Sequence, residues 1–102
     1  MLRIYKIPNE KMKEVKKIIE ENPYAEDSFS KKGYVLREGK ALKGDENAYY
    51  LIIEADEQFI KKADEKLKDL TTVLEGEEYE KIKKAYEEAE NAAQAGFGAL
   101  FG

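Results

Sequence analysis

The pattern of hydrophobic positions begins with a short strand. Over residues 2–7, side chains alternate between two faces, one carrying Leu2 and Ile4 and the other Arg3, Tyr5 and Ile7. After Pro8, hydrophobic residues recur every three or four positions, which predicts an amphipathic helix with the stripe Met12, Val15, Ile18 and Ile19. Asn9 is its expected N-cap. We expect the helix to end at Asn22, because the residue before a proline avoids the α region.

The middle of the chain contains the strongest predicted strand. Residues 48–55 (AYYLIIEA) are almost continuously apolar, which is typical of a central strand. The preceding stretch, residues 27–47, is ambiguous, because residues 34–36 are strand-like while Gly39 and Gly44 interrupt the pattern. Two interpretations are open: one long strand bulged near Gly39, which we favour, or a small hairpin that pairs residues 34–37 with residues 40–43.

The last third of the chain predicts a helix, a short strand and another helix. Asp56 is the expected N-cap of the first of these helices, whose buried stripe is Phe59, Ile60, Ala63, Leu67 and Leu70. Residues 71–75 are predicted as a final strand, ended by Gly76. The last helix should cover residues 77–95, with Gly96 as its C′ residue. Its predicted apolar stripe is Tyr79, Ile82, Tyr86, Ala89 and Ala93.

These elements follow the order β-α-β-β-α-β-α, which predicts an α+β fold. The first six match the split βαβ pattern of ferredoxin-like folds. Right-handed crossovers then give a four-stranded antiparallel sheet with both core helices on one face. The opposite face needs a cover, and the C-terminal helix or a second protomer would supply it. We therefore expect one domain over residues 1–95, followed by an apolar tail over residues 96–102.

The tail, GFGALFG, is unusual because it follows a helix crowded with Glu and Lys. Burying Phe97, Leu100 and Phe101 contributes about 1.5–3 kcal/mol each. Ordering seven backbone residues costs about 1–2 kcal/mol apiece, so burial alone does not clearly order the tail. We expect it to be ordered where it also gains backbone hydrogen bonds, as an added strand or in a groove. Its own sheet, a second copy and a different protein are the three candidate contacts.

The charge and composition of the chain bear on its expected partners and location. Charged residues make up 39% of the chain, and the net charge is only −4. The abundance of Lys and Glu resembles that of hyperthermophile proteins. Because the two signs are interleaved, nucleic acid is not an expected partner, since extended backbone binding needs a concentrated basic face. The first residues lack a long apolar segment typical of signal peptides, and no apolar run approaches about 20 residues, so we expect a cytoplasmic protein without membrane contact.

The residue types offer little catalytic chemistry. The chain contains no Cys and no His, which removes thiolate nucleophiles, the usual general base and the commonest metal ligand. Ser28 and Ser30 therefore lack a conventional base. Acidic pairs such as Glu77-Glu78 are best interpreted as favourable charge at a helix N-terminus. We expect neither an enzyme nor a bound metal or cofactor.

Three tyrosines, Tyr5, Tyr34 and Tyr50, are expected on the open face of the sheet. The segment from Ile4 to Asn9 (IYKIPN) resembles the first ribonucleoprotein motif of RNA-recognition domains, in which such rings stack on bases. The second motif should lie on the third strand, but residues 48–55 contain no Gly, Arg or Lys. The element order also resembles that of acylphosphatases, whose glycine-rich, arginine-bearing loop is replaced here by residues 8–11 (PNEK).

We therefore predict a small non-enzymatic interaction or regulatory module, most simply a homo-oligomer, that associates through the open sheet face, the last helix and the tail. Contact with another protein through the tail is the second possibility for that segment. The predicted interaction residues are Tyr5, Tyr34, Tyr50, Tyr79, Tyr86, Phe97, Leu100 and Phe101. One alternative is a small-ligand-binding domain with its site under the last helix or at a subunit boundary. A single-stranded RNA-binding module is the other.

Overall fold

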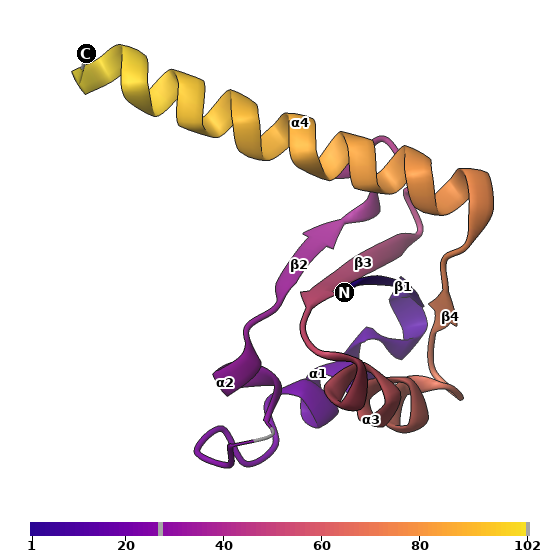
Figure 1. Cartoon of the computed structure of the whole chain (residues 1–102). Helices are drawn as coiled ribbons and strands as arrows, with labels where there is room; N and C mark the ends of the chain where they lie inside the picture. The colour runs from indigo at the N-terminus through magenta and orange to yellow at the C-terminus, as the bar shows by residue number, and fades with distance from the viewer. Residues whose placement is uncertain (27, 102) are drawn as a thin grey trace.

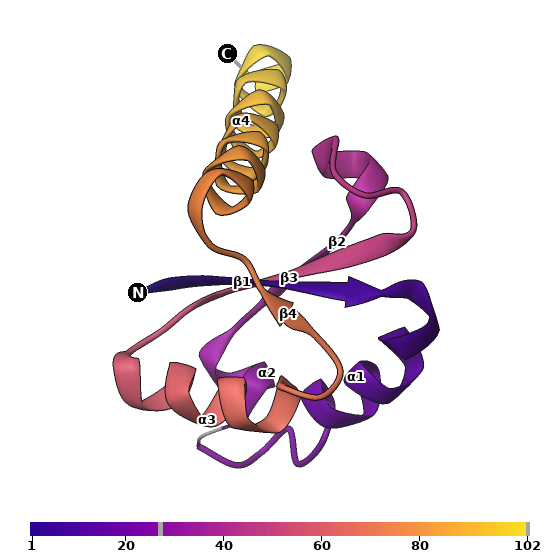
Figure 2. The ribbon, with the colours of Figure 1, turned by 90° about the vertical axis from the view of Figure 1, so that its right-hand side faces the viewer.

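A computed structural model describes the backbone of residues 1–26 and 28–101, and the side chains of these residues as far as Asn91. The chain forms an α+β domain in which one four-stranded antiparallel sheet carries helices on both faces (Figures 1 and 2). The strands are β1 (Leu2–Pro8), β2 (Val35–Glu38), β3 (Ala48–Glu54) and β4 (Thr72–Val73). The α-helices are α1 (Met12–Ile19), α2 (Phe29–Lys32), α3 (Glu57–Leu67) and α4 (Gly76–Phe101), and the 3₁₀ helices are η1 (Asn9–Lys11) and η2 (Gly39–Leu42).

The strand order is β2-β3-β1-β4, so β3 and β1 are central and β2 and β4 form the edges. Strands β1 and β3 pair along their whole length, from Leu2 opposite Glu54 to Pro8 opposite Ala48. The near-continuous apolar run of β3 is explained by this position, because five of its seven residues are buried between helices on both faces. The prediction of a central strand at this point in the chain is confirmed.

One face of the sheet packs on α1, α2 and α3 (Figure 2). Alternate residues of the two central strands point to this side and meet the apolar stripes of the helices. Asp56 caps α3 as predicted, accepting a hydrogen bond of 2.8 Å from the backbone N–H of Phe59. The buried residues of this layer are Tyr5, Ile7, Met12, Val15, Ile19, Phe29, Leu51, Ile53, Phe59, Ile60, Ala63 and Leu67.

The other face of the sheet is covered by the N-terminal half of α4, as the sequence pattern predicted. The 3₁₀ helix η2 also contributes to this layer, because its last residue, Leu42, is buried in the same cluster as Ile82 of α4. The buried residues here are Ile4, Leu42, Tyr50, Ile52, Leu74 and Ile82. The domain thus has two apolar layers, one on each side of a single sheet.

Both interpretations of residues 27–47 were wrong. After β2 the chain turns into η2, so neither a long bulged strand nor a second hairpin forms. Gly39 explains the turn, since a Cβ placed on it would lie 1.8 Å from the carbonyl oxygen of Asp45. The N–H of Gly44 closes the turn by donating to the carbonyl of Gly39 at 2.8 Å. This close backbone approach ends β2 and directs Leu42 under α4.

The first half of the chain contains three smaller differences. Asn9, the predicted N-cap, is instead the first residue of η1, and no side-chain hydrogen bond caps η1 or α1. Helix α1 ends at Ile19, three residues before the predicted end, and Asn22 has a left-handed φ of 43°. Asn22 lies two residues beyond the right-handed C-cap Glu20, so it turns the chain after the helix has already ended and directly before Pro23. The short helix α2 was not predicted; Ser28 caps it by accepting a hydrogen bond from the N–H of Lys31.

The end of α4 is the most consequential correction. The helix continues to Phe101 instead of closing at Gly96, so residues 96–101 are helical and only Gly102 of the predicted tail lies outside the described residues. Once a helix is formed, each added residue gains a backbone hydrogen bond, and no proline interrupts this segment. A helix of 26 residues is about 39 Å long, comparable to the 42 Å longest dimension of the molecule. Figure 1 shows its C-terminal half extending past the sheet.

Substituting Ala for Gly96 and Gly98 tests this correction. Inside a helix each glycine costs about 1 kcal/mol relative to alanine, so the Gly96→Ala/Gly98→Ala variant should gain helicity and thermal stability. A left-handed C′ glycine would give the opposite result, because alanine is strained there. Far-UV circular dichroism and thermal unfolding measure both quantities. A loss of helicity in the double variant would contradict a helix through residue 101.

Candidate interaction surface

Helix α4 is anchored to the sheet through its first three turns. Ile82 is 1% exposed and packs in the layer that contains Tyr50 and Ile52. Tyr79 and Tyr86 flank it at helical spacing and are half-buried against the same layer. The hydroxyl of Tyr79 donates a hydrogen bond of 3.4 Å to the carbonyl oxygen of Leu2. These contacts hold the N-terminal half of α4 across the sheet.

The helix crosses the edge strand β2 close to Glu90. There Glu90 Oε1 lies 3.4 Å from Arg37 Nη2, and both side chains are more than two-fifths exposed. A pair so exposed contributes little to stability, but it marks where α4 leaves the sheet. Residues 91–101, which we call the contact segment, follow directly and contain no Asp, Glu, Lys or Arg. The helix therefore changes from charged to uncharged where it passes beyond β2 (Figure 1).

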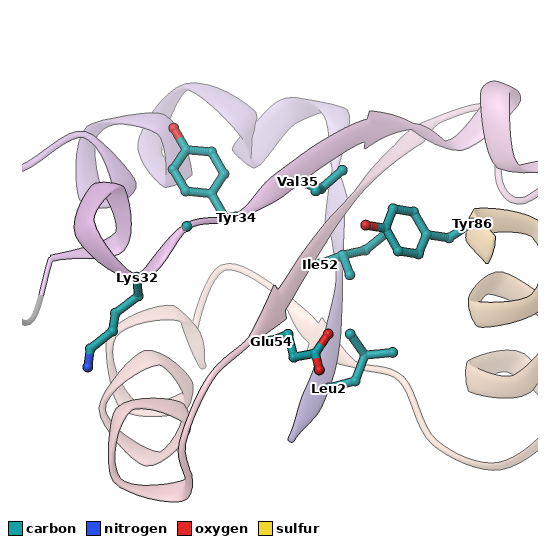
Figure 3. A pocket seen from close by; sticks show the side chains of 8 residues that line it. Leu2, Lys32, Tyr34, Val35, Ile52, Glu54 and Tyr86 are labelled. Atoms are coloured by element: carbon teal, nitrogen blue, oxygen red, sulfur yellow. The ribbon is translucent and has the colours of Figure 1, made fainter. Parts of the chain in front are cut away.

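A groove of about 290 Å³ opens beside this crossing, between α4 and the sheet (Figure 3). Figure 3 shows Tyr86 projecting from α4 toward Ile52, with Val35 and Leu2 on neighbouring strands. The residues that line this sheet–helix groove are Leu2, Lys32, Gly33, Tyr34, Val35, Ile52, Glu54 and Tyr86. Its apolar lining comes from β1, β2, β3 and α4, whereas the charged Lys32 and Glu54 are exposed.

A second hollow, of about 340 Å³, lies at the N-terminus of α4, and several of its lining side chains are charged. Lys6 Nζ lies 3.2 Å from Asp45 Oδ2 and 3.6 Å from Glu78 Oε1. Partial burial lowers the pKa of Lys6, but its hydrogen bond to Asp45 and the charge of Glu78 outweigh this and raise it. The backbone N–H of Asn47 and the ammonium of Lys6 lower the pKa of Asp45. Lys6 is thus already matched by two carboxylates of its own chain.

A partly buried hydrogen-bonded cluster joins β1 to α3. The Tyr5 hydroxyl donates to Asp64 Oδ1 at 2.5 Å, and Arg3 Nη2 lies 3.0 Å from Asp64 Oδ2. Burial of the ring raises the pKa of Tyr5 well above its usual range, and the hydrogen bond to Asp64 raises it further. Because Arg3 and Asp64 neutralise each other and Tyr5 is 0% exposed, the cluster holds α3 against the sheet.

The raised pKa of Tyr5 gives a stability change with a definite sign. The ordinary pKa of a tyrosine hydroxyl is 10.0, and that of Tyr5 is higher in the folded state. The stabilisation that the protonated hydroxyl gives the folded state is therefore complete below pH 10.0 and falls as the pH rises above it. Relative to a Tyr5→Phe variant, the native chain should lose up to about 1.4 kcal/mol of unfolding free energy per pH unit above about pH 10. Urea unfolding of both proteins between about pH 8 and 11 measures this difference. A difference that stays constant with pH would contradict the buried hydroxyl.

The predicted interaction tyrosines do not share one open face. Tyr5 and Tyr34 lie on the side of the sheet that packs on α1 and α3, which corrects their expected placement. The alternation of β1 explains this for Tyr5, because Ile7 lies on the same face of the strand and is buried in the layer beneath α1, α2 and α3. Tyr50 does face α4, but it is only 1% exposed, and its hydroxyl accepts a hydrogen bond from the N–H of Asp45. The rings of Tyr5 and Tyr50 are therefore covered and offer no face to a base.

The remaining predicted residues lie on α4. Tyr79 and Tyr86 pack against the sheet as expected of its apolar stripe. Phe97, Leu100 and Phe101 lie in the helical contact segment, and their side chains are outside the described residues. Sequence reasoning missed Leu2, Val35 and Ile52 as groove residues, since their strands come together only through the sheet register.

Within the described part of the chain, no helix combines the length and the apolar character needed to cross a membrane. Over the same residues, no group of three or more acidic side chains is arranged to hold a metal ion. No protein-family model, no curated protein sequence and no solved structure matches this chain.

Proposed function

We propose that this protein is a self-associating interaction module, and that the contact segment of α4 is the surface through which its copies meet. The observation that supports this most strongly is the change in composition along one continuous helix. Six of the ten residues from 81 to 90 are charged, whereas none of the eleven from 91 to 101 is. An uncharged segment that is rich in Ala, carries two Phe and one Leu, and extends from a charged domain is typical of a contact site.

The energetics of the segment also favour a partner. Two glycines within the helix, Gly96 and Gly98, cost about 1 kcal/mol each relative to alanine. The backbone hydrogen bonds of the helix offset part of the cost of ordering the chain, and burial of the large apolar residues supplies the rest. An isolated helix end with this sequence is therefore marginal, and contact with a second protein stabilises it.

We also propose that the domain that carries α4 is ferredoxin-like. Two features support this: β1 and β2 lie on either side of β3, and β3 and β4 lie on either side of β1. This is the arrangement expected of two interleaved βαβ units. In such a domain α4 is an addition that covers the face opposite α1 and α3. The covered sheet then serves as the platform that holds the contact segment away from the core.

Light scattering after size-exclusion chromatography tests the proposed function. The full chain should have a mass that is a multiple of 11.7 kDa, and a variant lacking residues 96–102 should have a lower mass. Because α4 is anchored by residues 79–86, the deletion leaves the two apolar layers intact, and unfolding of both proteins serves as the control. A full chain of 11.7 kDa at all concentrations, or an equal mass for both proteins, would contradict self-association through this segment.

A further inference from the structure

We infer that the hollow at the N-terminus of α4 binds a small zwitterion, namely a free α-amino acid. Three groups that line this hollow lack a matching partner among the residues that the structure describes: the ammonium of Lys81, the carboxylate of Glu77 and the hydroxyl proton of Tyr50. Such a site goes beyond the proposed self-association and does not depend on it.

The hollow lies where several elements of the fold meet. Lys6 belongs to β1, Tyr50 to β3 and Ile82 to α4, and Gly44 and Asp45 lie in the turn after η2. A small-molecule pocket usually measures about 300–1,000 Å³, so the volume of about 340 Å³ is at the lower end of that range. The hollow therefore suits a ligand the size of an amino acid better than a nucleotide or a peptide.

One side of the hollow is a charged cluster that the protein satisfies by itself. Lys6 lies between Asp45 and Glu78, and the N–H of Asn47 donates to Asp45 Oδ1 at 2.8 Å. Because the pKa of Lys6 is raised and that of Asp45 is lowered, both groups are charged at neutral pH. This cluster needs no ligand, but it gives the hollow a fixed wall of both signs.

Glu77 and Lys81, by contrast, lack an ion pair. They lie four positions apart on α4, with the glutamate first, an arrangement in which the two side chains can pair. Glu57 and Lys61 of α3 have the same spacing and do pair, with 3.7 Å between Glu57 Oε1 and Lys61 Nζ. Among the described residues, Glu77 and Lys81 pair neither with each other nor with a third side chain. One positive and one negative group thus line the hollow unmatched.

The third unmatched group is the hydroxyl of Tyr50, which is only 1% exposed. Its oxygen accepts a hydrogen bond of 3.0 Å from the N–H of Asp45. A phenolic hydroxyl can also donate one hydrogen bond, and no described residue accepts it. A buried donor without an acceptor is unfavourable, so an acceptor atom that enters the hollow would be stabilised there.

A zwitterion satisfies all three groups at once. Its carboxylate would accept from the Tyr50 hydroxyl and pair with Lys81, and its ammonium would pair with Glu77. A simple anion would meet three carboxylates and only two lysines in the hollow, because Asp45 and Glu78 also line its walls or lie beside Lys6. A simple cation would leave both Lys81 and the Tyr50 donor unmatched. The combination therefore selects a ligand that carries both charges.

An NMR titration with three related probes tests this site. The amide shifts of residues 44–46 and 77–82 are followed as L-alanine, propionate or ethylamine is added to the full chain at neutral pH. Propionate lacks the ammonium of L-alanine, and ethylamine lacks its carboxylate. We expect L-alanine to bind at least about tenfold more tightly than either truncated probe, since each of them loses one charge-assisted contact.

Two charge-neutralising variants test the assigned residues. Lys81→Gln and Glu77→Gln should each weaken the binding of L-alanine at least about fivefold. The matched controls are Lys84→Gln and Glu80→Gln, which remove the same charges from exposed positions of α4 outside the lining of this hollow. Both controls should keep the natural affinity. Because all four positions are exposed, circular dichroism should show the same helix content in every variant.

Three outcomes would overturn the site. The first is an absence of shifts up to the solubility limit of L-alanine, and the second is equal binding of L-alanine and either truncated probe. The third is an equal loss of affinity in the control variants, which would indicate attraction by overall charge. Tight binding of L-alanine that depends on both Glu77 and Lys81 supports the site. The mass of the chain enters none of these results, so a failure here leaves the proposed self-association in place.

Discussion

Replacing Ile82 by alanine is expected to lower the free energy of unfolding by about 2–5 kcal/mol, the usual cost of truncating a fully buried Ile. Ile82 is the only α4 residue, among those with described side chains, that is buried in the layer beneath the helix. It contacts the layer at the point where η2 approaches, since a Cβ on Gly44 would lie 2.9 Å from its Cδ1. Truncation leaves a cavity between α4 and β3 that the flanking tyrosines are too constrained to fill.

Denaturant unfolding of the Ile82→Ala variant measures this effect, with Ile18→Ala as the matched control. Ile18 lies on α1 and is only partly buried against the layer that α1, α2 and α3 cover, so the same chemical change there should cost distinctly less. The comparison separates docking of α4 from the general effect of removing Ile side-chain atoms. Equal losses, or a loss below about 1 kcal/mol for Ile82→Ala, would show that α4 is not anchored as described.

Substituting Glu for both Phe97 and Leu100 is expected to weaken self-association by at least about a hundredfold. A carboxylate in an apolar contact loses its hydration without a partner, and each loss of about 1.4 kcal/mol in binding free energy lowers the affinity tenfold. Four substitutions enter a dimer formed through this segment, two from each chain, so the effects act together. The domain itself should unfold as before, because the described core contains neither residue.

A dilution series by sedimentation velocity measures this dissociation. The control variant, Ser30→Glu/Gln58→Glu, adds the same charge at exposed positions on α2 and α3, on the other side of the sheet. It should associate like the natural chain, apart from a small effect of net charge. If the control dissociates as readily as Phe97→Glu/Leu100→Glu, overall charge and not the contact segment governs association.

The elements predicted most accurately are those whose signals are local. The alternation of β1, the apolar run of β3 and the N-cap Asp56 each lie within a few consecutive residues, and each element formed where it was expected. The helical stripe of α4 also predicted which of its side chains pack on the sheet. Tyr79, Ile82 and Tyr86 all contact the layer beneath it, although Ala89 on the same stripe is exposed.

The features that sequence reasoning missed depend on long-range or competing effects. The Tyr5–Asp64 hydrogen bond joins residues 59 positions apart, and nothing near Tyr5 indicates it. The turn at Gly39 depends on its close approach to the backbone of Asp45, and the periodicity of hydrophobic residues along the chain does not indicate such a contact. At Gly96 two local tendencies competed, since glycine favours a C′ position while the preceding alanine-rich helix favours propagation, and propagation prevailed.

Amide hydrogen exchange as a function of protein concentration tests most directly whether the contact segment is the site of self-association. Residues 91–101 should exchange rapidly in dilute solution, where the helix end has no partner, and slowly at concentrations at which the chain associates. Residues 77–86, which are anchored to the sheet of their own chain, serve as the internal reference and should keep the same protection throughout. Protection of residues 91–101 that does not change with concentration, while the mass does, would contradict the account.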